Sequence, residues 1–251
     1  MERTAVLGRL TWQIGEVIEL VRETPDVSSL VLDVPGWSGH RAGQHVDVRL
    51  TAEDGYQAQR SYSIASPPEE QRVALTVERL DDGEVSPYLV GEVVVGDRLE
   101  LRGPIGGYFV WEADHWAQPI LMTGGGSGVV PLMAMLRHRR ARGSRAPTRL
   151  LYSARSMEHV IYRDELQRLA AAGDGLAMHL TLTRAQPPGW KGYGRRIDRD
   201  MLEEVAWAAG DAPLVFICGP TPFVEAAGGL LVELGHDARL IKTERFGPTG
   251  G

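Results

Sequence analysis

Residues 60–66 read Arg-Ser-Tyr-Ser-Ile-Ala-Ser, which places an arginine, a tyrosine and serines within one short segment. On a strand, Arg60, Tyr62 and Ile64 share one face and Ser63 lies on the other. A guanidinium can bind a pyrophosphate through two parallel hydrogen bonds. The ring of Tyr62 can stack on another flat ring, and the Ser63 hydroxyl can approach a ring nitrogen. The segment therefore indicates a site for an aromatic cofactor with a phosphate tail, although a half-buried strand with an exposed arginine has the same pattern.

A second segment, residues 122–131, reads Met-Thr-Gly-Gly-Gly-Ser-Gly-Val-Val-Pro and follows an apolar stretch. Its glycines follow the spacing Gly126-x-Gly128-x-x-Pro131, which lets the backbone approach a pyrophosphate and places proline in a first helical turn. A flexible linker is the alternative, but an apolar helix follows directly. A hydrolase nucleophile at Ser127 would need glycine two residues later, where the chain has Val129.

A third segment, Cys218-Gly219-Pro220, follows the apolar residues 214–217. Cys218 is the only cysteine, so the chain can form neither an internal disulfide nor an iron–sulfur cluster with four thiolate ligands. A lone cysteine is most often a buried small apolar residue. Its position before Gly-Pro at the end of a strand favours a functional role.

Together, and in this order, these segments resemble the ferredoxin–NADP reductase family. The resemblance covers nearly the whole chain and includes the Gly83-Glu84-Val85-Ser86 turn. It implies that Arg60 contacts the FAD pyrophosphate, that Tyr62 stacks on the isoalloxazine, and that Ser63 approaches flavin N5. It also implies that the turn caps a helix whose amides hold phosphate, a role with a physical basis in the helix dipole. For Ser86 alone, a plain helix cap is the alternative.

The resemblance also implies residues for hydride transfer, namely Ser63, Cys218 and Glu244, with Cys218 near C4 of the nicotinamide. Phe246 is the candidate aromatic cover of the flavin, although plant-type members end on a tyrosine and this chain continues to Gly251. The cofactor-binding residues that the resemblance implies are Arg60, Tyr62, Ser63, Ile64, Val77, Arg79, Gly83, Val85, Ser86, Thr123, Gly124, Gly126, Ser127, Gly128, Arg155, Thr183, Arg184, Arg195, Cys218, Gly219, Pro220 and Phe246.

Arginines at three expected strand ends favour NADPH over NADH. They are Arg155, Arg184 and either Arg195 or Arg196. Arginine suits the 2′-phosphate that distinguishes the two nucleotides. An NADH enzyme more often presents an acidic residue to the ribose, and none stands at these positions.

The elements that would position these residues change character near the middle of the chain. The first half contains short segments rich in Val, Leu and Tyr between turn residues, which predict an antiparallel barrel. The expected strands are 13–21, 28–34, 45–50, 59–65, 73–79 and 98–102, with a short helix near 85–90.

The second half alternates strands with helices and predicts a doubly wound parallel sheet. The expected strands are 119–123, 149–153, 176–183, 214–218 and 238–243, and the expected helices are 129–142, 162–172 and 222–234. We therefore expect two domains, a FAD-binding barrel over residues 1–113 and an NADP-binding α/β domain over residues 114–251. The basic run 137–142 is expected to be a solvated helix end.

The net charge of −6 and pI near 5.7 lack the basic character of a nucleic-acid-binding protein. The seven histidines show no metal-ligand spacing, so no metal is expected. The first 20 residues carry charges throughout and do not resemble a signal peptide. Residues 116–136 are uncharged but contain two prolines and several glycines, which argues against a membrane span. The expected location is cytoplasmic.

The sequence thus predicts an FAD-dependent NADPH oxidoreductase that passes single electrons to a separate protein, such as a ferredoxin, a flavodoxin or an oxygenase component. Three alternatives remain. The first is an FMN-using oxygenase reductase. The second is a reductase of free flavin or oxygen. The third is a regulatory nucleotide-binding protein without turnover, which would be expected to lack Ser63 or Cys218.

Overall fold

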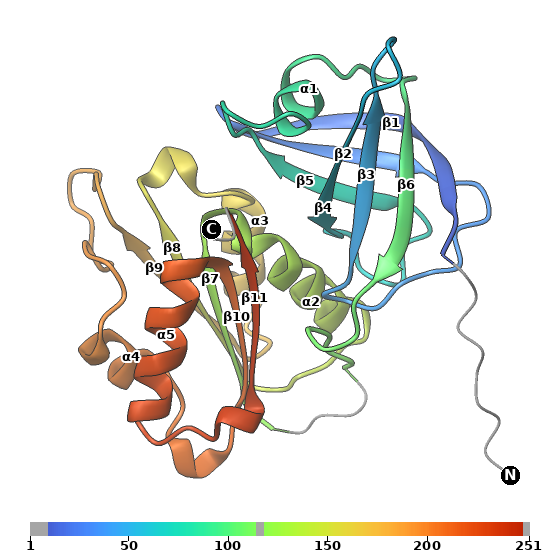
Figure 1. Cartoon of the computed structure of the whole chain (residues 1–251). Coiled ribbons are helices and arrows are strands. Elements are labelled where there is room, and N and C mark those ends of the chain that lie inside the picture. Colours follow the sequence, from blue (N-terminus) through green and yellow to red (C-terminus); the bar gives the residue numbers. More distant parts are fainter. Residues whose placement is uncertain (1–9, 114–117, 248–251) are drawn as a thin grey trace, which may run out of the picture.

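The computed structural model describes residues 10–113 and 118–247. Within them the chain forms an antiparallel sheet of six strands, followed by a parallel sheet of five strands with helices on both faces (Figure 1). Both parts of the predicted fold are confirmed. The expected domain boundary at residue 114 lies outside the described residues, so the division at that residue stays a prediction.

The antiparallel sheet curves into a barrel. Its strands are β1 (Trp12–Thr24), β2 (Val27–Asp33), β3 (His45–Thr51), β4 (Gln57–Ser63), β5 (Val73–Glu78) and β6 (Arg98–Ile105), in the order β4-β3-β6-β1-β2-β5. The two outer strands meet directly after β4, where Ile64 bridges to Leu75 and the amide of Ala65 donates to the carbonyl of Ala74 at 2.7 Å. This contact closes the sheet and leaves the end of β4 beside β5.

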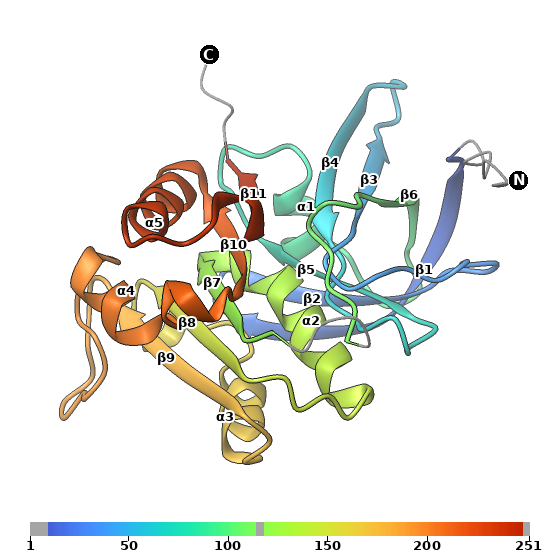
Figure 2. The same cartoon turned by 90° about the horizontal axis from the view of Figure 1, so that it is seen from below.

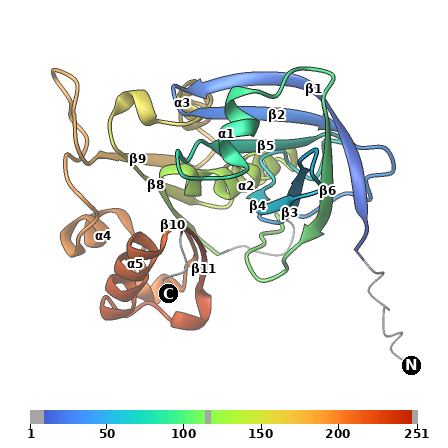
Figure 3. The same ribbon diagram turned by 45° about the horizontal axis from the view of Figure 1, so that its top comes forward.

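Alternate residues of these strands fill the barrel, as the period of a strand requires. Leu30 and Leu32 of β2, for example, are fully buried together with Val46 and Val48 of β3. Helix α1 (Ser86–Gly91) lies beside β2 and β5 and adds Leu89 to this core (Figure 3).

The parallel sheet has the strand order β11-β10-β7-β8-β9. Its strands are β7 (Ile120–Gly125), β8 (Thr148–Ala154), β9 (Leu176–Leu182), β10 (Leu214–Pro220) and β11 (Ile241–Phe246). The chain runs outward from β7 to β9 and then returns to the other side of β7. The strand order therefore reverses between β7 and β10, the position at which open α/β sheets bind ligands.

Helices cover both faces of this sheet (Figure 2). Helices α2 (Val129–Ala141) and α3 (Arg163–Ala171) pack on one face, against Ile120 and Met122 of β7. Helices α4 (Arg199–Val205) and α5 (Thr221–Glu233) pack on the other, against Leu121. Because both faces are covered, β7 is buried along its whole length, and this explains why its first three residues, 120–122, are all apolar.

Three details differ from the sequence prediction. The last strand begins at Ile241, because residues 238–240 form a 3₁₀ turn that Asp237 caps. Helix α4 was not predicted, although Asp198 caps it by accepting a hydrogen bond from the amide of Met201 at 2.9 Å. The basic run is solvated only in part: residues 140–142 are exposed as expected, but Arg139 is only 1% exposed and its guanidinium pairs with Asp174 at 2.9 Å.

The two halves share one apolar core. Ala65, Phe109 and Trp111 of the first half are buried in the same cluster as residues of α2 and of β7. Polar contacts add to it, since Arg137 donates to the carbonyl of Ala65 at 2.8 Å and the Tyr162 hydroxyl donates to Thr76. The barrel and the sheet are therefore held in a fixed relation at the site described next. Among the described residues, no helix combines the length and apolar character needed to cross a membrane.

Candidate active site

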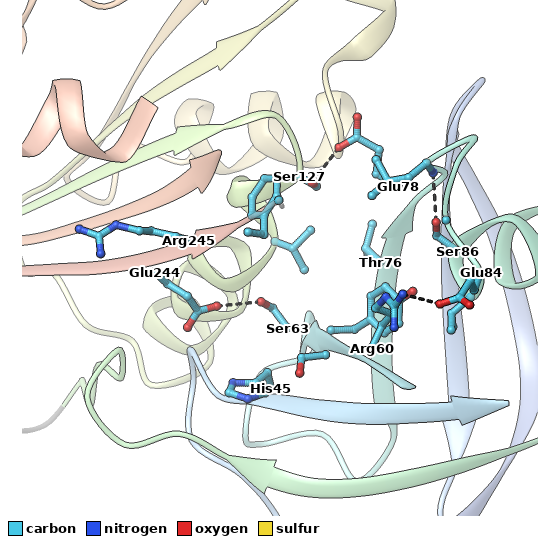
Figure 4. A pocket seen from close by; sticks show the side chains of 18 residues that line it. His45, Arg60, Ser63, Thr76, Glu78, Glu84, Ser86, Ser127, Glu244 and Arg245 are labelled. Carbon is cyan, nitrogen blue, oxygen red and sulfur yellow. Dashed lines mark hydrogen bonds and ion pairs between the residues drawn. The ribbon is translucent and has the colours of Figure 1, made fainter. Parts of the chain in front are cut away.

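A cavity of about 640 Å³ lies between the barrel and the ends of the parallel strands (Figure 4). Its size falls within the range of small-molecule and cofactor sites. Residues of both halves line it, namely His45, Arg60, Ser61, Tyr62, Ser63, Thr76, Glu78, Leu80, Gly83, Glu84, Val85, Ser86, Ser127, Val130, Glu244, Arg245, Phe246 and Gly247. Nine of the residues implied by the resemblance are among them: Arg60, Tyr62, Ser63, Gly83, Val85, Ser86, Ser127, Glu244 and Phe246.

Strand β4 supplies one wall of this cavity. Tyr62 packs partly against the barrel core, and burial raises the pKa of its phenol well above the ordinary value. The ring is therefore a neutral, firmly packed surface that can stack on a flat ligand. Ile64, two residues further on, is fully buried in the barrel and does not line the cavity.

Arg60 already has an anionic partner in the cavity. Its guanidinium donates to Glu84 at 2.6 Å, and the Tyr56 hydroxyl donates to the other carboxylate oxygen at 2.5 Å. These two hydrogen bonds lower the pKa of Glu84, first through Tyr56 and then through Arg60. The Arg60 side chain is half exposed. The Arg60 guanidinium can therefore bind another anion, which would compete with the Glu84 carboxylate.

The turn before α1 is held by the Ser86 hydroxyl, which accepts a hydrogen bond from the amide of Leu80 at 3.1 Å. The helix-cap alternative for Ser86 is wrong, because Val85 is the N-cap and no side chain caps this helix. A Cβ on Gly83 would lie 2.9 Å from the Ser86 hydroxyl and 3.0 Å from the carbonyl oxygen of Leu80, so a larger residue would crowd this turn. Val77 is buried in the barrel core, and Arg79 lies outside the cavity.

Ser63 and Glu244 meet across the cavity from opposite halves of the chain. The Ser63 hydroxyl donates to the Glu244 carboxylate at 3.2 Å (Figure 4). Burial raises the pKa of Glu244 to about 7, against the opposite effect of the Ser63 hydrogen bond. Glu244 can therefore hold or release a proton near neutral pH.

Cys218 lies beside this pair, because it is the register partner of Glu244 in the parallel ladder of β10 and β11. It is 1% exposed and does not line the cavity. Burial, followed by the nearby charge of Glu244, raises the pKa of its thiol well above the ordinary value. Cys218 is consequently a neutral thiol that can shape the site without acting as a base.

His45 is a cavity residue that the sequence did not single out. It stands opposite Ser63 in the ladder of β3 and β4. Burial lowers the pKa of its imidazole, against the opposing charge of Asp47. Only the strand register places it there, so its sequence position carried no signal.

The glycine segment lies at the reversal of strand order. Gly128 packs against β10 so closely that a Cβ would lie 2.1 Å from the carbonyl oxygen of Cys218. Gly125 and Gly219 both face the ring of Phe223, at 2.9 and 2.7 Å from their virtual Cβ atoms. Internal packing thus accounts for these three glycines. Gly126 is different, because it has a φ of +56° and its nearest neighbour is the Glu78 carboxylate at 3.9 Å.

The expected nucleotide arginines divide into two groups. Arg155 and Arg184 are neighbours, because the amide of Arg184 donates to the carbonyl of Arg155 at 2.9 Å. Both side chains are exposed, and neither has an ion pair within the part of the chain that is described. Arg195, by contrast, is paired with Asp198, so its guanidinium is already engaged.

The remaining expected residues lie near these groups but outside the main cavity. Thr123 is fully buried, and its hydroxyl has no hydrogen-bond partner among the described residues. Thr183 bonds to the carbonyl of Ala154 through its amide at 2.9 Å. Pro220 is exposed at the end of β10, and Gly124 packs against Val129. No cluster of three or more potential metal ligands occurs in the ranges 10–113 and 118–247.

Comparison with known proteins agrees with this arrangement. Residues 15–110 match the family of oxidoreductase FAD-binding domains, and residues 122–228 match the family of oxidoreductase NAD-binding domains. The FAD/NAD-binding domain of nitric oxide dioxygenase from Vibrio cholerae superimposes with a TM-score of 0.84 at 25% identity, over 94% of this chain and 99% of that one. The chain therefore combines the FAD-binding domain and the NAD-binding domain of an oxidoreductase.

Ferredoxin–NADP reductase B of Sorangium cellulosum is 38% identical over 213 residues, which cover 82% of this chain and 84% of that protein. The glycine betaine monooxygenase reductase subunit of Chromohalobacter salexigens is 32% identical over 248 residues, or 95% of this chain. This chain spans 66% of the length of that subunit. The chain belongs to the ferredoxin–NADP reductase family.

Proposed function

We propose that the protein takes a hydride from NADPH onto bound FAD and passes single electrons to a separate protein. Ferredoxins, flavodoxins and oxygenase components are the acceptors that fit this role. The observation that carries the proposal is the meeting of Ser63 and Glu244 from the two halves at one end of a cavity walled by Tyr62.

The residues of the cavity fit FAD. Tyr62 offers a neutral ring for stacking, Ser63 offers a hydroxyl, and Arg60 offers a half-exposed guanidinium on the same strand. The turn from Gly83 to Ser86 adds backbone amides near Arg60 for the phosphates. Bound FAD would supply the acceptance of a hydride and the release of electrons one at a time. The protein would bind it, orient it and exclude water from it.

The nucleotide is proposed to extend from Cys218 across the glycine segment to the neighbouring arginines Arg155 and Arg184. This proposed nucleotide site lies where the strand order of the sheet reverses, which is where such sheets bind dinucleotides. The two arginines lie on neighbouring backbone segments, are exposed and have no ion pair among the described residues, so their guanidinium groups suit a 2′-phosphate. We therefore propose NADPH as the preferred donor. Arg195 contributes less, because it is paired with Asp198.

Ser63, Cys218 and Glu244 are the proposed catalytic residues. Glu244, with a pKa near 7, can hold a proton at the end of the cavity and exchange it through the Ser63 hydroxyl. The buried thiol of Cys218 stays protonated and lies behind the cavity wall as a small apolar group in register with Glu244. Phe246 lines the same end of the cavity, is 37% exposed and is the proposed cover of the flavin.

A separate acceptor is proposed because the chain has one cysteine and so holds no four-thiolate cluster of its own. Several relatives are named as reductase components of oxygenases, and another as a ferredoxin–NADP reductase.

The test is an anaerobic titration of the purified protein with NADPH and, separately, with NADH. We expect the flavin absorbance to disappear at a lower concentration of NADPH. A colourless protein that no flavin reconstitutes would contradict the proposal. Rapid NADPH consumption with free flavin and no protein acceptor would support the alternative of a flavin reductase.

A further inference from the structure

One hydrogen bond crosses from the barrel to the glycine segment. Glu78 is the last residue of β5, and Ser127 is the middle residue of the 3₁₀ turn Gly126–Gly128. The Ser127 hydroxyl donates to the Glu78 carboxylate at 2.7 Å (Figure 4). Ser127 is among the expected cofactor-binding residues, but Glu78 has no role in the proposed flavin or nicotinamide contacts.

Glu78 and Ser127 separate two spaces. Both residues line the main cavity, and both also line a smaller pocket of about 30 Å³. This second pocket extends to Arg155 and His159. The Glu78–Ser127 contact is therefore the partition between the flavin cavity and the region of the nucleotide arginines.

The Glu78 carboxylate of this partition lies beside the open face of Gly126. The Glu78 carboxylate lies 3.9 Å from the place of a Cβ on Gly126, and apart from the chain neighbours of Gly126 no other described residue has an atom within 4 Å of that position. Gly126 is the glycine of this segment whose open face is not filled by internal packing. A dinucleotide that reaches from Cys218 to Arg155 must carry its pyrophosphate past this face, and so past the carboxylate.

We propose that Glu78 sets the affinity of the protein for its nicotinamide nucleotide, by placing a negative charge beside the path of the pyrophosphate. This inference rests on the nucleotide position given under the proposed function. Like charges in such a contact repel, and the repulsion acts equally on the reduced and the oxidised nucleotide. Glu78 thereby weakens nucleotide binding and favours release of the product. It is a positioning residue for the nucleotide and not a catalytic one.

A purely structural role of Glu78 predicts a different effect of its substitution. If Glu78 only tied the barrel to the sheet, its loss would lower stability without improving binding. The two halves are also joined by their common apolar core and by the contact of Arg137 with Ala65. The substitution Glu78→Gln keeps an oxygen that can accept from Ser127 and removes only the charge. It should therefore fold normally.

The experiment uses the full chain loaded with FAD. NADP⁺ is titrated by difference absorbance into the wild type, Glu78→Gln and Glu78→Asp, and KM and kcat for NADPH are measured with ferricyanide as acceptor. We expect Glu78→Gln to lower the dissociation constant and KM about tenfold with kcat unchanged, the size that a partly screened like-charge contact supports. Glu78→Asp, which keeps the charge, should stay within about threefold of the wild type. The gain of Glu78→Gln should shrink as salt is raised.

The matched control is Glu158→Gln. Glu158 is exposed on the turn next to His159 but lines neither space, so its loss changes the net charge by the same amount. Its NADP⁺ affinity should equal that of the wild type. An unchanged or weaker affinity in Glu78→Gln, or an equal gain in Glu158→Gln, overturns the inference. Failure of the wild-type flavin to be reduced by either nucleotide would instead overturn the proposed function.

Discussion

The raised pKa of Glu244 predicts a loss of stability as the pH rises. In the unfolded chain the ordinary pKa of this carboxyl is 4.5, and in the folded chain burial raises it to about 7. Below pH 4.5 both states are protonated and the group has no effect. Between pH 4.5 and 7 the unfolded state releases the proton first, so unfolding becomes more favourable, and above pH 7 the effect is complete. Each pKa unit corresponds to 1.36 kcal/mol, so the loss is on the order of 3 kcal/mol.

The perturbation that isolates this effect is Glu244→Gln, which keeps the size of the side chain and an acceptor for Ser63. Its stability is compared with that of the wild type from pH 4 to pH 8 by thermal unfolding of flavin-free protein, so that ligand binding does not contribute. The contributions of other titrating groups to the pH dependence of stability are the same in both proteins, so they cancel when the two are subtracted. We expect the variant to gain about 3 kcal/mol relative to the wild type across this range, or about 6–12 °C in Tm for a chain of this size. A difference that stays constant with pH, or that moves in the opposite direction, would refute the reasoning.

Three further predictions concern the cofactor and nucleotide contacts. Glu84→Gln should release Arg60 to an incoming pyrophosphate and lower the FAD dissociation constant about tenfold, measured by flavin fluorescence; a weaker FAD affinity would show that Glu84 helps to bind the cofactor. Gly128→Ala should destabilise the protein by about 3 kcal/mol or more, because its Cβ would lie 2.1 Å from a backbone carbonyl, whereas Gly229→Ala, inside α5 with no atom within 4 Å, should stabilise it by up to about 1 kcal/mol in urea unfolding. Arg155→Ala should raise KM for NADPH about tenfold and leave KM for NADH unchanged; equal effects on both would assign Arg155 to a contact other than the 2′-phosphate.

The succession of strands and helices along the chain and the main motifs could be predicted from the sequence, because each depends on a local pattern. The apolar run of β7, the glycines after it and the Arg-x-Tyr-Ser segment on β4 are all visible in single stretches of the chain. The helix α4 was missed although Asp198 provides a helix cap, because its short apolar pattern is weak. The start of β11 was placed three residues early, since a 3₁₀ turn there continues the apolar pattern.

The contacts that tune the site could not be predicted, because they join residues far apart in the sequence. Glu84 and Arg60 are 24 residues apart, and Ser127 and Glu78 are 49 apart. His45 reaches the cavity only through the register of β3 with β4. Such pairs depend on how the barrel closes and on how it packs against the sheet. Sequence motifs point to the proposed ligand-binding segments, but not to the carboxylates of Glu84 and Glu78 that contact them.

The common apolar core of the two halves has a consequence for how substrates enter. Domains joined by small polar interfaces commonly open by hinge motion, but a large apolar contact resists it. Here α2 is buried against Phe109 and Trp111, and separation of the two halves would expose these apolar side chains to water. We therefore expect ligands to reach the cavity without a hinge opening of the two halves, past lining side chains such as Arg60 and Glu84 that are already about half exposed. Removal of either half should leave the other with an open, aggregation-prone face instead of a free-standing fragment.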